Sequence, residues 1–139
     1  MAKRAKSKPV PQAAVVAVRH GRVCLITSSS GRRWLVPKGK RQSGRGLRET
    51  ARREAWEEAG LVGRVSERPL GRYQFEKLGC RHTVVVYRMR VDAAVDDWPE
   101  RGKRLRDWVR PADLPGRLHH AGLRDLVRSA LGRPGGEAA

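Results

Sequence analysis

The chain has 139 residues, a length that suits a single domain, and its 39 % hydrophobic content excludes a wholly disordered protein. Lysine and arginine number 31 against 14 aspartates and glutamates, which gives a formal net charge of +17. This excess favours a polyanionic partner such as nucleic acid, a phosphorylated metabolite or a membrane surface, although a bias toward arginine codons would also produce it.

The apolar residues and the cysteines indicate the cellular compartment in which the protein is expected. No run of about 18 apolar residues is present, so no membrane span is predicted. The basic start lacks the apolar core and the cleavage site of a signal peptide. Cys24 and Cys80 have no metal-like spacing, and we expect free thiols in a reducing compartment. A cytoplasmic location is therefore the default expectation.

The first part of the chain predicts a basic arm followed by strands. Residues 1–9 carry four cations and are expected to form a flexible arm. Residues 12–28 contain two apolar runs separated by Arg-His-Gly-Arg, which predicts two antiparallel strands with a turn at Gly21. A short strand is predicted at 34–37, and a cationic loop with several glycines follows at 38–46.

Residues 47–60 give the strongest helix signal in the chain. Leu47, Ala51, Ala55 and Ala59 recur every four residues and form a narrow apolar stripe. Because three of these residues are alanines, the helix can approach a sheet closely. A glycine at position 60 supplies the C-terminal stop.

The second part of the chain predicts more strands and a closing helix. Residues 70–77 and 81–91 are expected to form two strands joined by a turn, and 105–111 a further short strand. Residues 119–131 have the apolar spacing of an amphipathic helix, and 132–139 are expected to be a disordered tail. The order of elements predicts an α/β (α+β) fold in which a mixed β-sheet is sandwiched between helices.

Three glutamates are concentrated near the end of the predicted helix. Glu54, Glu57 and Glu58 stand at i, i+3 and i+4, so they share one helical face. Like charges at this spacing cost about 0.2–0.5 kcal/mol per pair, and the C-terminal end of the helix dipole also disfavours them. A divalent cation would stabilise such a cluster, because carboxylates are preferred ligands of Mg²⁺ and Mn²⁺. The alternative is a solvated acidic face paired with Arg52 and Arg53.

The segment before this helix suggests a phosphate-bearing substrate. A glycine loop with Lys38 and Lys40 precedes the acidic helix, so cations and candidate metal ligands would lie close together. This combination is typical of phosphoryl chemistry, in which a metal bridges phosphate oxygens and a carboxylate activates water.

Residues 39–61 resemble the Nudix box, G-x5-E-x7-R-E-U-x-E-E-x-G-U, in which U is aliphatic. One position departs from the pattern, since Arg45 stands where the box has its first glutamate, and Glu49 one turn further on is a possible partial substitute. The resemblance implies a Nudix fold over residues 10–131. The fixed positions of the box are matched by Gly39, Arg53, Glu54, Glu57, Glu58, Gly60 and Leu61.

The resemblance also implies roles for individual residues. Glu54 and Glu58 would be direct ligands of Mg²⁺ or Mn²⁺, and the backbone carbonyl of Lys38 a further ligand. Glu57 would be the catalytic base or an additional metal ligand. Arg53 would hold the junction between loop and helix.

Four further segments carry a second resemblance: 28–39 (SSSGRRWLVPKG), 81–87 (RHTVVVY), 96–109 (DDWPERGKRLRDWV) and 112–114 (ADL). With them, residues 10–130 resemble one subfamily, the diphosphoinositol polyphosphate and diadenosine polyphosphate phosphohydrolases. The similarity implies hydrolysis of a diphosphate linkage in a highly phosphorylated small molecule. Several charge-assisted donors are then needed to meet the phosphates. The candidate contacts are Arg33, Lys38, Gly39, Lys40, Arg45, Arg81, His82 and Arg106.

Two alternatives remain open at this point. The same chemistry would suit RNA 5′ ends or nucleoside triphosphates, and a catalytically weak scaffold would bind nucleic acid through its basic surface. Nucleic acid is not favoured, because no basic motif with interleaved aromatic residues is present. Trp34, Trp98 and Trp108 are either a stacking platform for a base or packing residues. A monomer or a homodimer is expected, with no membrane partner.

Overall fold

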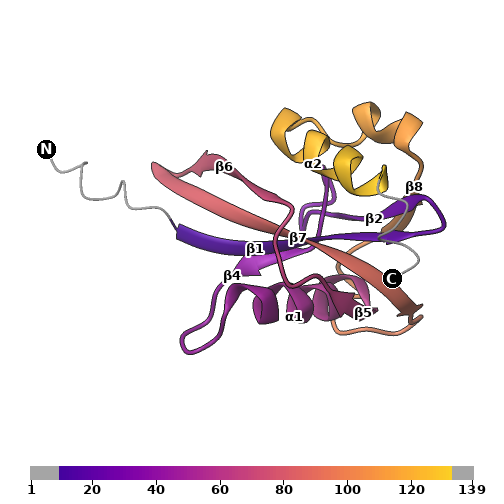
Figure 1. The fold of residues 1–139 in the computed structure, drawn as a ribbon, viewed down its shortest axis with the longest axis horizontal. Coiled ribbons are helices and arrows are strands. Elements are labelled where there is room, and N and C mark those ends of the chain that lie inside the picture. The colour runs from indigo at the N-terminus through magenta and orange to yellow at the C-terminus, as the bar shows by residue number, and fades with distance from the viewer. Residues whose placement is uncertain (1–9, 133–139) are drawn as a thin grey trace, which may run out of the picture.

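The computed structural model describes residues 10–132, which form one mixed sheet with a helix on each face. Helix α1 (Leu47–Ala59) lies below the sheet and helix α2 (Ala121–Leu131) above it (Figure 1). The predicted sandwich of a mixed sheet between helices is therefore confirmed. The predicted arm and all but the first residue of the predicted tail lie outside the described residues.

The sheet contains eight strands, with an order β3-β2-β1-β7-β5 along its main path. Strands β1 and β7 are parallel, and the other paired strands are antiparallel. A short 3-10 helix (Pro111–Gly116) precedes α2. The strands are β1 (Val10–Arg19), β2 (Arg22–Thr27), β3 (Trp34–Leu35), β4 (Lys38–Lys40), β5 (Leu61–Val65), β6 (Gly71–Lys77), β7 (Cys80–Ala94) and β8 (Arg106–Val109).

Strand β1 changes partner along one edge, and this change creates the site described below. Its first half pairs with β4, from Gln12 opposite Lys40 to Ala14 opposite Lys38. Its second half pairs with β2. Between them, the N–H of Val15 donates to the carbonyl of Pro37 at 3.1 Å, which fixes where β4 begins. The sequence predicted that the three residues of β4 belong to a loop, and this prediction was wrong. These residues form a strand because they pair with β1, which is distant in sequence, and such pairing leaves no local pattern.

Strand β5 was not foreseen from the sequence. Its buried residues, Leu61 and Val65, are separated by a short stretch that contains Gly63. A Cβ atom at Gly63 would lie 2.1 Å from the carbonyl oxygen of Arg90, at an irregularity in the pairing with β7. Because the two backbones approach closely, only glycine fits at position 63. A glycine within a strand weakens the strand signal, which is why the sequence did not reveal β5.

The core consists of one apolar cluster on each face of the sheet. Alternate residues of β1 enter opposite clusters, so that Val16 packs on the α2 side and Val15 on the α1 side. The three alanines of the predicted α1 stripe are fully buried against the sheet, and Leu47 is half-buried. Gly60 adopts the left-handed conformation with φ of 67° and ends α1 as expected. Within residues 10–132, no helix has the length and apolar character needed to cross a bilayer.

Candidate active site

The candidate site is organised around β4, whose residues alternate between the two faces of the sheet. Lys38 and Lys40 line a pocket on the α2 side. Gly39 faces α1, since a Cβ atom at this position would lie 2.3 Å from Oε2 of Glu54. The backbone N–H of Lys38 donates to Oε1 of Glu58 at 3.1 Å. Two of the three predicted glutamates thus converge on the backbone of β4, and only a glycine leaves room for them.

The ionisation of these two carboxyl groups is strongly perturbed. The pKa of Glu54 is raised to about 8, mainly by burial and then by the charge of Glu58. Burial also raises the pKa of Glu58, although the nearby charge of Arg104 opposes the shift. Two partly buried carboxylates that repel each other form an anionic site that a cation would stabilise.

Glu58 is further fixed by Arg104, which the sequence did not single out, and by Trp98. The guanidinium of Arg104 donates to Oε2 of Glu58 at 3.3 Å, to Glu100 at 2.7 Å and to the carbonyl of Thr27 at 2.9 Å. The indole N–H of Trp98 donates to the backbone carbonyl of Glu58 at 3.1 Å. Arg104 lies in an irregular segment 46 residues from Glu58, so no local sequence pattern could have identified it.

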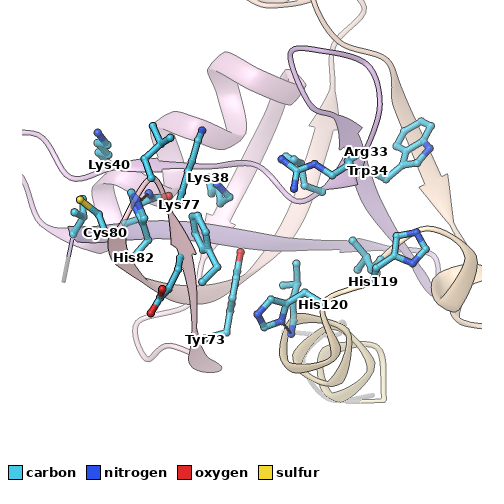
Figure 2. Close-up of a pocket in the computed structure, with 18 residues that line it drawn as sticks. Arg33, Trp34, Lys38, Lys40, Tyr73, Lys77, Cys80, His82, His119 and His120 are labelled. Carbon is cyan, nitrogen blue, oxygen red and sulfur yellow. Dashed lines mark hydrogen bonds between the residues drawn. The ribbon is translucent and has the colours of Figure 1, made fainter. Parts of the chain in front are cut away.

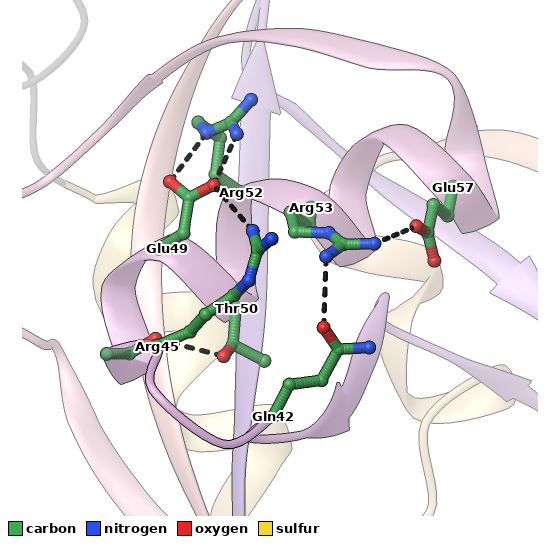
Figure 3. Close-up of polar contacts among 8 residues, drawn as sticks. Gln42, Arg45, Glu49, Thr50, Arg52, Arg53 and Glu57 are labelled. Atoms are coloured by element: carbon green, nitrogen blue, oxygen red, sulfur yellow. Dashed lines mark hydrogen bonds and ion pairs between the residues drawn. The ribbon is translucent and has the colours of Figure 1, made fainter.

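The third glutamate of the motif has a different environment. Arg53 donates to Oε2 of Glu57 at 2.7 Å and to the side-chain carbonyl of Gln42 at 3.0 Å (Figure 3). The guanidinium therefore connects the loop before α1 to the last turns of the helix. The junction role that the motif implies for Arg53 stays a prediction, and the contact with Arg53 leaves Glu57 ion-paired.

Arg45 and Glu49 form a separate group of charges. Glu49 pairs with Arg45 at 3.8 Å and accepts two hydrogen bonds from Arg52 (Figure 3). The bond from Arg52 is the main cause that lowers the pKa of Glu49. Arg45, just before α1, and Glu49, in its first turn, are thus engaged with each other and with Arg52, and the structure does not place Glu49 with Glu54 and Glu58.

Arg106 also lies elsewhere than the sequence suggested. Its guanidinium donates to the carbonyls of Ala59 at 2.7 Å and Val95 at 2.8 Å and stacks over the Trp98 ring at 4.3 Å. These contacts bind the C-terminal end of α1 to the segment before β8. Arg106 therefore holds these segments together, and it is not among the residues that line the pocket on the α2 side. Arg81 is exposed and is not among the residues that line the pocket.

The pocket on the α2 side has a volume of about 610 Å³. Lys38, Lys77 and His82 lie near one another at one end, and Arg33 and Trp34 lie at the other (Figure 2). The lining is also aromatic, since Phe75 belongs to it and carries the Lys38 ammonium 4.9 Å from its ring centre. The pocket therefore offers apolar surface together with positive charge.

The three tryptophans that the sequence left as either stacking or packing residues have different surroundings. Trp34 lines the pocket, with the Arg117 guanidinium 4.5 Å from its ring centre. Trp98 packs beneath Arg106, and Trp108 packs against the apolar cluster on the α1 side. Sequence reasoning missed Phe75 and Lys77, although the alternation of β6 carries the signal.

The residues at β4 fit a divalent cation of the magnesium type. Mg²⁺ is commonly bound by one or two carboxylates together with waters and substrate phosphates. Glu54 and Glu58 supply the two carboxylates. Burial and then the charge of Glu58 raise the pKa of Glu54, and a bound cation would offset both effects by stabilising the ionised form. Across residues 10–132, no group of three or more His, Cys, Asp or Glu residues is arranged to hold a metal, in keeping with the pairing of Glu57 to Arg53.

Comparison with known proteins supports the resemblance that residues 39–61 indicated. The NUDIX domain family matches residues 8–129. Nudix hydrolase 4 of Arabidopsis thaliana is 33 % identical over 91 residues, covering 63 % of this chain and 42 % of that protein. The chain spans about half the length of the first curated relatives it matches.

Solved structures share the fold. The MutT protein from Methanosarcina mazei Go1 has a TM-score of 0.72 at 22 % identity, covering 90 % of this chain and 94 % of that one. The Ap4A hydrolase of C. elegans has a TM-score of 0.71 at 21 % identity, covering 87 % and 95 %. At these identities, the likeness concerns the fold alone.

Proposed function

Because this chain belongs to the Nudix hydrolase family, we propose that it hydrolyses a diphosphate linkage in a highly phosphorylated small molecule, with Mg²⁺ or Mn²⁺ as cofactor. The observation that carries the proposal is the position of β4. One side of this strand meets Glu54 and Glu58, and the other side presents Lys38 and Lys40 to the pocket. A phosphate chain lying along β4 would contact both sets of groups.

The chain's own residues divide the work of binding and proton transfer. Glu54, Glu58 and the backbone carbonyl of Lys38 would hold the cation, which when bound neutralises phosphate charge and acidifies water. Arg53 orients Glu57 through their 2.7 Å ion pair, so Glu57 is the carboxylate that we assign to accept a proton from the attacking water. Lysine and arginine side chains around the pocket would bind the remaining phosphates.

The lining of the pocket favours one of the two substrate classes suggested by the sequence. Phe75, Tyr73 and Trp34 offer aromatic surface beside the cations. A purine ring would stack on such surface, whereas an inositol ring carrying phosphates on its carbons is polar throughout. We therefore place a dinucleoside polyphosphate such as diadenosine tetraphosphate ahead of an inositol pyrophosphate. The Ap4A hydrolase of C. elegans shares this fold, but the lining of the pocket carries the choice.

The proposal is tested by a product-release screen in the presence of Mg²⁺. The screen compares diadenosine tetraphosphate with an inositol pyrophosphate, ADP-ribose, a nucleoside triphosphate and 5′-triphosphorylated RNA. Diadenosine tetraphosphate is expected to give the highest kcat/KM, and Glu58→Gln to remove most turnover while the fold persists. Glu49→Gln is the matched control, because Glu49 lies on the same helix but is paired with Arg52. A preference for ADP-ribose or RNA would contradict the substrate assignment, and no hydrolysis of any compound would contradict the proposed activity.

A further inference from the structure

The pocket contains a buried pair of polar side chains. One is His82, a candidate phosphate contact from the sequence, and the other is Gln12, to which nothing above gives a role. Gln12 on β1 is 5 % exposed and His82 on β7 is 8 % exposed, and both line the pocket. The side-chain amide nitrogen of Gln12 lies 2.8 Å from Nδ1 of His82. Burying a polar group costs free energy unless the group forms a hydrogen bond, and this contact supplies one to each of the two side chains.

The contact determines which ring nitrogen of His82 carries the proton. An amide nitrogen can only donate, so Nδ1 must accept, and in the neutral ring the proton then resides on Nε2. The surroundings keep the ring neutral, since burial and the charges of Lys40, Lys38 and Lys77 lower the pKa of His82. Nε2 therefore carries an N–H group that points away from the nitrogen held by Gln12.

The orientation of the imidazole is fixed by a second contact. His82 stands opposite Phe75 across the antiparallel β6–β7 pair, and the two rings stack with their centres 4.7 Å apart and an angle of 7° between their planes. The Lys38 ammonium lies over the Phe75 ring. The imidazole is thus held in its plane by Phe75 and in its rotation by Gln12, close to the cations that would surround a phosphate (Figure 2).

We propose that Gln12 is a positioning residue that holds His82 as a neutral Nε2–H donor, and that this donor binds a phosphate oxygen of the substrate in the pocket. The proposal rests on the proposed function for the identity of the substrate. It assigns His82 to recognition and not to acid catalysis, because a neutral imidazole whose Nδ1 is already occupied provides one donor and no ready proton. Glu76 is the single acidic residue among those that line the pocket, so the surrounding charge favours an anionic acceptor.

The tautomer can be measured without any substrate. Nitrogen NMR of the ligand-free protein at neutral pH is expected to show His82 with a protonated Nε2 and an unprotonated Nδ1. Gln12→Met, which keeps the size of the side chain but cannot donate, is expected to leave a mixture of tautomers. Gln74→Met is the matched control, because Gln74 on β6 donates to the hydroxyl of Thr83 at 3.2 Å and not to His82. A doubly protonated ring or an Nδ1–H tautomer in the wild type would overturn the proposal.

Binding is measured separately by calorimetry in EDTA, with diadenosine tetraphosphate and inorganic tripolyphosphate as probes. Gln12→Met and His82→Phe, which preserves the stacked ring, are each expected to weaken both probes about tenfold, as loss of one hydrogen bond predicts. His82→Gln, whose amide nitrogen can replace the Nε2 donor, is expected to regain most of this loss. In turnover, Gln12→Met is expected to raise KM with kcat unchanged.

The outcomes separate this inference from the proposed function. If Gln12→Met and His82→Phe bind the probes as tightly as the wild type while the wild type hydrolyses diadenosine tetraphosphate, the hydrolase stands and the donor role is wrong. If the wild type binds neither probe in EDTA, the donor role is wrong, whereas the hydrolase is judged separately by the product-release screen in Mg²⁺. A fall in kcat with KM unchanged would also contradict the assignment, since it would indicate a role in the chemical step.

Discussion

Replacing Gly39 by alanine tests how closely β4 and Glu54 depend on each other. The new Cβ atom would lie 2.3 Å from Oε2 of Glu54, where ordinary contact begins near 3.4 Å. The carboxylate must therefore move by about 1 Å, and a misplacement of about 1 Å at a reacting centre costs about 10²-fold in rate. This corresponds to about 2.7 kcal/mol of transition-state stabilisation.

The assay compares kcat/KM for diadenosine tetraphosphate in Mg²⁺ with the free energy of unfolding in EDTA. We expect Gly39→Ala to lose about 10²-fold in kcat/KM, and to change stability by less than about 1 kcal/mol, because the displaced atoms are the end of a flexible side chain. Gly102→Ala is the control, since a Cβ atom there would meet nothing within 4 Å. Wild-type activity in Gly39→Ala would refute the view that Glu54 must occupy the space beside this glycine.

The remaining predictions concern the supports of the site. Arg106→Gln is expected to lose about 3 kcal/mol in urea unfolding, because two charged hydrogen bonds to carbonyls are removed, with KM unchanged; a raised KM with full stability would restore the substrate role. Arg104→Ala is expected to lose about 3–5 kcal/mol by the same measurement, since it leaves Glu58 as an unpaired charge 10 % exposed, and a loss below about 1 kcal/mol would contradict this. The raised pKa of Glu54 means that the folded protein binds more protons than the unfolded chain between pH 4.5 and about 8. Without metal, the melting temperature should therefore fall across this range, and Mg²⁺ should raise it more at pH 8.5 than at pH 6; a gain independent of pH would count against the carboxylate pair as the binding site.

Features with a local cause could be predicted from the sequence. Helix α1 follows from its alanine stripe and from the glycine at position 60, which takes the left-handed conformation at the helix end. The β1–β2 and β6–β7 hairpins follow from apolar runs separated by a glycine turn, and the structure pairs them as expected. The positions of Glu54 and Glu58 on one helical face follow from their spacing of four residues.

Features that depend on contacts distant in sequence were not accessible in this way. Strand β4 exists because β1 changes partner, and β5 exists because its backbone fits against β7 at Gly63. Arg106 has the positive charge and the hydrogen-bond donors that a phosphate ligand needs. Its partners in the structure are instead a carbonyl at the end of α1 and the Trp98 ring. A cationic side chain can serve either purpose, and only its neighbours in space distinguish them.

The central claim is that Glu54 and Glu58 together hold a divalent cation beside β4 that the substrate phosphates share. The most direct measurement is an anomalous difference map from crystals grown with Mn²⁺ and a non-hydrolysable diadenosine polyphosphate. We expect a peak within coordination distance of both carboxylates and the backbone carbonyl of Lys38, with a phosphate oxygen on the same ion. Absence of manganese at this position, with the polyphosphate bound elsewhere on the protein, would contradict the account.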